Sequence, residues 1–241
     1  MAPAASSPFW SALRREFCQM SVKDKRIVVT GGARGIGARL VGELRERGAD
    51  VVSTDILPGC DIVCDVSDEQ DVIALFNETG DIDGLVNNAA MLVGRRPFHE
   101  ISIDEWDRMM AVNVRGTFMC AREASKHMPN GGSIVNVSST TALSGSQGFL
   151  HYVASKGAVI SMTRSMAFEL GPKQIRVNCV GPGFTPTEGS AVLGAYDPTR
   201  TPLGRVMEPD DLLGTYCYLL SDDSKFVTAQ LIVVDGGRFP H

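Results

Sequence analysis

A glycine-rich turn between a short apolar run and a helical stretch is the feature that most constrains this chain. Residues 30–37 read Thr-Gly-Gly-Ala-Arg-Gly-Ile-Gly, directly after an apolar run at 27–29 and before a segment rich in Leu, Val and Ala. Gly31 permits a tight turn, Gly35 lets the backbone approach a phosphate, and Gly37 lets the helix pack against the strand. The pattern predicts a pyrophosphate site at a helix N-terminus, although a ligand-free turn also remains compatible with it.

A carboxylate follows at the distance where dinucleotide folds bind the ribose. The apolar run at 51–54 ends at Asp55, whose side chain would accept hydrogen bonds from the ribose hydroxyls and repel a 2′-phosphate. Asp55 therefore favours NAD over NADP. Arg34, inside the glycine turn, argues the other way because a basic group there would suit a 2′-phosphate. We predict NAD as the cofactor; an aspartate that merely ends a strand is the alternative.

Composition limits the function classes. The chain has 241 residues, of which 44% are hydrophobic, enough for one α/β domain. The net charge of −5 without a long basic run does not favour nucleic-acid binding. No apolar stretch reaches the length of a membrane span, and the four histidines lack metal-ligand spacing. The six cysteines form no Cys-x-x-Cys pair, so we expect reduced thiols in a cytoplasmic protein without metal.

Apolar runs alternate with helical patterns along most of the chain. Strands are expected at 26–30, 50–54, 60–64, 84–88, 133–137, 175–180 and 231–234. Helices are expected near 35–47, 68–78, 102–128, 152–171 and 209–220. This alternation predicts an α/β fold with a Rossmann-type, doubly wound, mostly parallel sheet of about seven strands. Residues 1–22 are expected to form an N-terminal tail, and residues 23–241 a single dinucleotide-binding domain.

One connection between expected strands is unusually short. Only a few residues, including Pro58 and Gly59, separate Asp55 from the strand expected at 60–64. Parallel strands normally need a crossover of a dozen residues or more, usually a helix. We therefore expect a bare loop here and a sheet that is less covered near this edge.

A tyrosine and a lysine lie four residues apart at the start of the helix expected at 152–171. Tyr152 and Lys156 therefore project from one helix face. A phenol has a reference pKa near 10, but a nearby ammonium and a helix N-terminus both lower it. Tyr152 would then exchange a proton with an alcohol or carbonyl oxygen. Such pairs are also common on exposed helix faces without any chemistry.

Two serines follow the strand expected at 133–137. Ser138 and Ser139 would lie at the carboxyl edge of the sheet, where open α/β folds bind ligands. A hydroxyl there would hold a substrate oxygen beside the phenol, whereas a turn or cap role would explain either serine alone.

These segments together resemble the short-chain dehydrogenase/reductase family in its single-domain form, from about residue 24 to the C-terminus. The resemblance rests on Thr30-Gly31-x-x-x-Gly35-x-Gly37 and Tyr152-x-x-x-Lys156. Asn87-Asn88-Ala89-Ala90 resembles the family's Asn-Asn-Ala-Gly element, with Ala90 in place of glycine. Near the C-terminus, Val234-Asp235-Gly236-Gly237 is similar to the family's last strand ending.

The resemblance implies a catalytic set of four residues. They are Asn113, Ser139, Tyr152 and Lys156, with Ser139 chosen over Ser138 because it precedes Tyr152 by the family's usual thirteen residues. Tyr152 would be the general acid/base, Ser139 would orient the substrate oxygen, and Asn113 would hold a water through its backbone carbonyl. Lys156 would bind the nicotinamide ribose and lower the pKa of the phenol.

The resemblance also implies the cofactor contacts and the reaction. The cofactor-binding residues are Gly31, Arg34, Gly35, Ile36, Gly37, Asp55, Asp65, Val66, Asn88, Ala89, Tyr152, Lys156, Pro182, Gly183 and Thr187. The reaction would be reversible hydride transfer between a secondary alcohol and a nicotinamide, with oxidation the favoured direction. An NADPH-dependent carbonyl or ketoacyl reductase is the first alternative, and a non-catalytic NAD-binding sensor is the second.

The substrate site is expected to vary most. The substrate loop should span about 188–206, and the pocket candidates are Met91, Leu92, Val93, Thr141, Leu143, Phe149, His151, Phe184 and Leu193. Their mostly apolar character predicts a cyclic or aromatic alcohol rather than a sugar or a phosphorylated metabolite, but does not identify it. The helices at 102–128 and 152–171 carry apolar residues on more than one face. Because such helices pair across two-fold axes in the family, we expect a homotetramer, with a dimer as the alternative.

Overall fold

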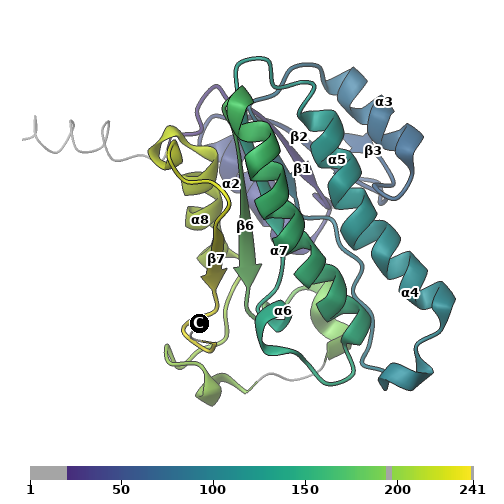
Figure 1. The fold of residues 1–241 in the computed structure, drawn as a ribbon. Coiled ribbons are helices and arrows are strands. Elements are labelled where there is room, and N and C mark those ends of the chain that lie inside the picture. The colour runs from purple at the N-terminus through teal and green to yellow at the C-terminus, as the bar shows by residue number, and fades with distance from the viewer. Residues whose placement is uncertain (1–20, 194–196, 240–241) are drawn as a thin grey trace, which may run out of the picture.

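The computed structural model describes residues 21–193 and 197–239, and most of the tail expected at 1–22 lies outside them. In the described chain, one seven-stranded sheet has the order β3-β2-β1-β4-β5-β6-β7, with every pair parallel (Figure 1). The strands are β1 (Arg26–Thr30), β2 (Asp50–Asp55), β3 (Ile62–Val63), β4 (Gly84–Asn87), β5 (Gly132–Val137), β6 (Ile175–Pro182) and β7 (Leu231–Val234). The Rossmann-type fold predicted from the alternation of strands and helices is confirmed.

Helices cover both faces of the sheet. They are α2 (Gly35–Glu46), α3 (Glu69–Thr79), α4 (Ile103–Met110), α5 (Thr117–Ala124), α6 (Thr141–Ser144), α7 (Leu150–Leu170) and α8 (Asp210–Leu220). Short 3-10 turns lie at Phe98–Glu100, Gly171–Lys173, Glu188–Leu193, Pro198–Arg200 and Asp222–Ser224. Helices α2 and α8 pack on one face, and α3, α5 and α7 on the other (Figure 1).

The sheet sorts its side chains between these two layers. Ile27 and Val29 belong to the core beneath α2 and α8, whereas Val28 belongs to the core beneath α3 and α5. This alternation follows from the two-residue period of a strand. Val22, at the end of the expected tail, is also fully buried in the first core. Both faces of the central strands are therefore buried, and the functional groups lie where the strands end.

The expected crossover without a helix is present between β2 and β3. Asp61 in this loop accepts hydrogen bonds from the backbone and the hydroxyl of Ser53, at 2.7 and 2.6 Å, and from Arg45 at 2.6 Å. These contacts hold the loop in the absence of helix hydrogen bonds. The strand expected at 60–64 is only two residues long, and Val63 at the sheet edge is 64% exposed.

The helix expected at 102–128 is continuous only from Ile103 to Ala124, and its middle is a π-helical turn, Ala111–Gly116. Ser102 starts it, because its hydroxyl accepts a hydrogen bond from the backbone N–H of Glu105 at 3.1 Å. A π turn inserts an extra residue into the helix, often at a functional site. Here it carries Asn113.

Candidate active site

The turn between β1 and α2 requires glycine at positions 31, 35 and 37. Gly31 and Gly35 have φ of 68° and 59°, in the left-handed region that a side chain disfavours. A Cβ on Gly37 would lie 2.0 Å from the carbonyl oxygen of Gly31. The turn therefore leaves bare backbone at the N-terminus of α2, which is the kind of cradle that a pyrophosphate needs.

The loop after β4 is fastened to this turn. The hydroxyl of Thr30 accepts hydrogen bonds from the backbone N–H groups of Asn88 and Ala89, at 3.1 and 3.0 Å. The amide of Asn88 donates to the carbonyls of Thr30 and Gly31, at 3.0 and 3.1 Å. The structure thus brings together the first two expected cofactor elements and adds Thr30, which the sequence pattern marked only as the start of the turn.

Asp55 lies beside the glycine turn, as its position at the end of β2 predicts. Its Oδ2 accepts a hydrogen bond from the Ala33 N–H at 3.2 Å, and its Oδ1 accepts one from the Leu57 N–H at 3.1 Å. Arg34 is exposed at the start of α2 and makes no capping bond with its side chain, and Ile36 is half-buried behind it. The carboxylate and the guanidinium that argue for different cofactors are therefore both present at this edge.

Two further cofactor candidates follow β3. Asp65 is exposed, and its carboxylate accepts hydrogen bonds from the N–H and hydroxyl of Ser67 at 2.8 and 2.7 Å. Val66 is buried, and its carbonyl would lie 2.9 Å from a Cβ on Gly116. Both residues lie at the carboxyl edge of the sheet, on the same side as Asp55.

The segment after β6 returns to the glycine turn. The Pro182 carbonyl accepts a hydrogen bond from the Thr140 N–H at 3.0 Å, and the Gly183 N–H donates to the Val234 carbonyl at 2.8 Å. A Cβ on Gly35 would lie 3.3 Å from the side chain of Thr187. Thr187 therefore lies over the turn, so the expected segment and the glycines face one site.

The catalytic candidates from β5 and α7 meet at the carboxyl edge of the sheet. The Nζ of Lys156 is buried, donates to the Val137 carbonyl at 2.8 Å and lies 5.8 Å from the ring centroid of Tyr152. The Ser139 hydroxyl lies close enough to the phenol of Tyr152 to interact with it and to act on its pKa in the lowering direction. Ser138, by contrast, is buried and donates to the Lys156 carbonyl at 2.8 Å. The geometry favours Ser139 over Ser138, as the spacing did.

Asn113 connects this pair to the loop after β4. Its Oδ1 accepts from the Met91 N–H at 2.7 Å, and its Nδ2 donates to the Met91 carbonyl at 3.1 Å and to the Ser155 hydroxyl at 3.0 Å. Its backbone carbonyl, the group that the family resemblance assigns to a water, accepts the Thr117 hydroxyl at 2.9 Å. The buried amide thus joins three elements around the Tyr152–Lys156 pair.

Burial sets the pKa values of this pair. It raises the pKa of Tyr152 to about 12, and the interaction with Ser139 acts in the lowering direction. Burial also lowers the pKa of Lys156 to about 8. In the protein without cofactor, desolvation penalises the charged form of both groups, so the pKa of Tyr152 is raised where the sequence predicts a lowered one.

The substrate-pocket candidates divide into three sets. Met91, Leu92 and Val93 are half-buried along the loop after β4. Phe149 is buried with its ring 5.8 Å from that of Tyr152, and Thr141 donates its hydroxyl to Ser139 at 2.9 Å. Leu143 is exposed, and the side chain of Leu193 lies outside what the structure describes.

His151 is fully buried rather than open to a pocket. Its Nε2 lies 2.9 Å from the Glu105 carboxylate, which also pairs with Arg96 at 3.1 Å. Its Nδ1 has no hydrogen-bond partner among the described residues. The imidazole therefore links the first turn of α7 to α4, directly beside Tyr152.

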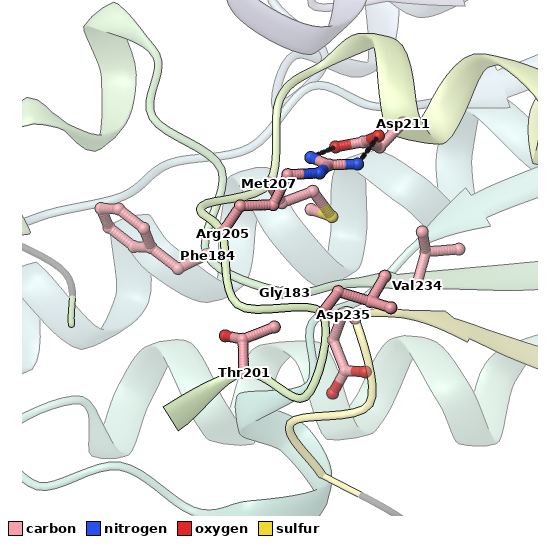
Figure 2. A pocket seen from close by; sticks show the side chains of 10 residues that line it. Gly183, Phe184, Thr201, Arg205, Met207, Asp211, Val234 and Asp235 are labelled. Atoms are coloured by element: carbon pink, nitrogen blue, oxygen red, sulfur yellow. Dashed lines mark hydrogen bonds and ion pairs between the residues drawn. The ribbon is translucent and has the colours of Figure 1, made fainter. Parts of the chain in front are cut away.

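Phe184 belongs to a separate cavity of about 180 Å³ at the carboxyl ends of β6 and β7. Figure 2 shows this cavity with Arg205 in a two-point ion pair with Asp211, at 2.6 Å for each hydrogen bond. Gly183, Phe184, Thr201, Leu203, Arg205, Met207, Asp211, Val234, Asp235 and Gly236 line it. It touches the cofactor segment through Gly183 but includes none of the four catalytic candidates.

Other kinds of site receive no support from the described residues. Among residues 21–193 and 197–239, no cluster of His, Cys, Asp or Glu has metal-binding geometry, and no helix is long and apolar enough to cross a membrane. The cysteines in these ranges are not paired in disulfides, and four of them are buried: Cys64, Cys120, Cys179 and Cys217.

The fold and the site define a nicotinamide-dependent oxidoreductase of the Rossmann type, and comparison with known proteins identifies its family. A family model described as enoyl-(acyl carrier protein) reductase matches residues 31–238. The cis-4-hydroxycyclohexanecarboxylate dehydrogenase of Sinomonas cyclohexanicum is 37% identical, over 87% of this chain and 94% of that protein. The NADP-dependent (R)-specific alcohol dehydrogenase of Lentilactobacillus kefiri is 35% identical, over 90% of this chain and 97% of that protein.

A solved structure agrees with these relatives. The 3-ketoacyl-(acyl-carrier-protein) reductase of Brucella melitensis, in complex with NADH, superposes with a TM-score of 0.86 at 30% identity, over 90% of this chain and 99% of that one. The chain belongs to the short-chain dehydrogenase/reductase family. It is an oxidoreductase that uses a nicotinamide cofactor and a small-molecule substrate.

Proposed function

We propose that this protein is an NAD-dependent dehydrogenase that oxidises a mostly apolar, cyclic secondary alcohol to a ketone. The observation that supports it best is the convergence of Ser139, Tyr152 and Lys156 beside the glycine turn at the carboxyl edge of one sheet. A non-catalytic NAD-binding sensor has no need of this arrangement. We therefore favour the enzyme over the sensor.

The roles follow from the positions of the side chains. Tyr152 takes the hydroxyl proton of the alcohol, and Ser139, which interacts with the same phenol, orients the substrate oxygen. When bound, the nicotinamide accepts the hydride from the carbinol carbon. Lys156 would bind the ribose and favour the phenolate by its charge, and Asn113 fixes the surrounding loop and helix through Met91 and Ser155.

The bare cradle at Gly31, Gly35 and Gly37 fits a dinucleotide, and Asp55 beside it favours the unphosphorylated ribose. Both carboxylate oxygens of Asp55 accept backbone hydrogen bonds, which hold the side chain at the end of β2. The other proposed cofactor contacts follow strands at the same carboxyl edge of the sheet. They are Asp65, Val66, Asn88, Ala89, Pro182 and Thr187. An NADPH-dependent reductase remains the alternative because Arg34 is exposed nearby.

We expect NAD to be preferred over NADP by at least about tenfold in kcat/KM, or roughly 1.4 kcal/mol. The reason is repulsion between Asp55 and a 2′-phosphate. The measurement is initial rates with each cofactor at saturating alcohol, for the wild type and for Asp55→Ala, which should lose most of the preference. Arg34→Ala is the matched control and should keep the preference for NAD. Equal use of both cofactors by the wild type would contradict the assignment.

The substrate class rests on the apolar loop Met91–Val93 and on Phe149 beside the phenol. A relative named as a hydroxycyclohexanecarboxylate dehydrogenase is consistent with a cyclic alcohol. The experiment is a panel of secondary alcohols, cyclic and open-chain, followed by the absorbance of NADH. Turnover confined to acyl-carrier-protein ketones with NADPH would favour the reductase instead.

We also propose a homotetramer in the cytoplasm. On α5 and α7, Phe118 and Phe168 are 45% and 82% exposed, and every residue of the edge strand β7 is only half-buried. These surfaces suit two different two-fold contacts. The unpaired, buried cysteines favour a reducing compartment.

Light scattering at micromolar concentration should therefore report about four times the chain mass of 25.9 kDa. Phe168→Glu should reduce the mass, because a charge on that face opposes the pairing of α7 with a second copy. Phe226→Glu is a suitable control, since Phe226 is fully exposed and lies outside α5, α7 and β7. A monomeric wild type with full activity would show that these helix faces have another purpose.

A further inference from the structure

Two consecutive arginines, Arg95 and Arg96, attach the loop after β4 to the segment that leads into α7. The Arg96 N–H donates to the Gly148 carbonyl at 2.9 Å. The Nη1 of Arg95 donates to the Ser146 hydroxyl at 3.0 Å and to the Gln147 carbonyl at 2.5 Å. These contacts fix the direction of the Arg95 side chain although it is exposed.

Aromatic contacts then connect Arg95 to the catalytic phenol. The guanidinium carbon of Arg95 lies 4.5 Å from the ring centroid of Phe149, and this ring lies 5.8 Å from that of Tyr152. A single aromatic ring therefore separates the guanidinium from the proposed acid/base. A substrate that extends from the phenol past this ring would bring its other end to Arg95.

The charge of Arg95 is not neutralised in the described part of the chain. Arg96 pairs with Glu105 at 3.1 Å, but no carboxylate of the described residues pairs with Arg95. Its Nη2 and Nε have no hydrogen-bond partner there either, because both side-chain hydrogen bonds of Arg95 come from Nη1. A guanidinium that is held by one nitrogen and leaves the others uncommitted suits two-point binding of a carboxylate.

We propose that Arg95 is a specificity-determining residue that binds a carboxylate on the substrate, so that the enzyme acts on a cyclic hydroxy acid. This proposal rests on the proposed function, because it places the carboxylate at the far end of the alcohol that Tyr152 deprotonates. The buried ring of Phe149, packed between Arg95 and Tyr152, sets the separation of the two polar ends. The same geometry disfavours neutral alcohols, which would leave the guanidinium unpaired under the substrate.

The test compares matched substrates on the whole enzyme with NAD. Each pair consists of a hydroxycyclohexanecarboxylate and its neutral primary amide, which differ mainly in charge. We expect the wild type to prefer the carboxylate in kcat/KM. Arg95→Gln should lower kcat/KM for the carboxylate by about tenfold or more, mainly through KM, and change the amide by less than about twofold. Arg95→Lys should retain part of the preference because it keeps the charge but not the planar fork.

Arg108→Gln is the matched control, since it removes the same charge from an exposed site on α4. Cyclohexanecarboxylate serves as a second probe, as a competitive inhibitor that should weaken in Arg95→Gln but not in Arg108→Gln. Equal losses for carboxylate and amide would mean that Arg95 only holds the loop, and no change for either would also overturn the proposal. Failure of every alcohol with both cofactors would instead overturn the proposed function.

Discussion

Replacing Tyr152 by phenylalanine should lower alcohol oxidation by about two orders of magnitude or more, because the variant keeps the ring but loses the proton acceptor. The phenol is the group of α7 that interacts with the Ser139 hydroxyl, and Lys156 lies on the same helix face. The measurement is kcat with saturating NAD and alcohol. NADH binding, measured by fluorescence, should be retained because the glycine turn is untouched.

Tyr218→Phe is the control for the loss of a phenol elsewhere, since Tyr218 lies on α8. It should keep full activity. A Tyr152→Phe enzyme that retained most of its turnover would remove Tyr152 from the mechanism, whatever its effect on stability.

The pH dependence has a defined sign. Burial raises the pKa of Tyr152 to about 12 in the protein alone, so the phenol is protonated at neutral pH. Oxidation requires the phenolate, and its kcat/KM should therefore rise with pH below that pKa. Reduction requires the phenol, and its rate should not rise. In Tyr152→Phe the increase for oxidation should disappear.

The sequence predicts the glycine turn and the strand-end residues of this site well, because both depend on local patterns. The glycines at 31, 35 and 37 mark a turn that other residues cannot form, and strand periodicity places Asp55 and Ser139 at one edge of the sheet. These features follow from backbone geometry and from the parallel topology. They do not require knowledge of distant contacts.

Contacts between distant segments could not be predicted in the same way. Glu105 is 46 positions from His151, and the stacking of Arg95 on Phe149 depends on how two loops meet. The sequence pattern predicts one continuous helix over 102–128 and does not reveal the π turn that carries Asn113. The sequence predicts a lowered pKa for Tyr152, whereas burial raises it. A lysine four residues away is visible in a sequence, but burial is a property of the whole fold.

Gly37→Ala should have the second large effect, a loss of NAD affinity of about a hundredfold or more. A Cβ at this position would lie 2.0 Å from the Gly31 carbonyl oxygen and 2.6 Å from the Asn88 amide. Because the first contact is with backbone, the turn itself must open, and the N–H groups at the start of α2 lose their arrangement. We also expect a destabilisation of about 2–3 kcal/mol from the forced shift.

Gly42→Ala is the matched control because it makes the same substitution five residues further along α2. A Cβ on Gly42 would meet nothing within 4 Å. This variant should keep its NAD affinity and gain about 0.5–1 kcal/mol in the free energy of unfolding, since alanine is the better helix former. Calorimetric titration with NAD and thermal unfolding measure both quantities for the two variants. If Gly37→Ala bound NAD as tightly as Gly42→Ala does, the close packing of α2 on the turn would not be what holds the cofactor cradle in shape.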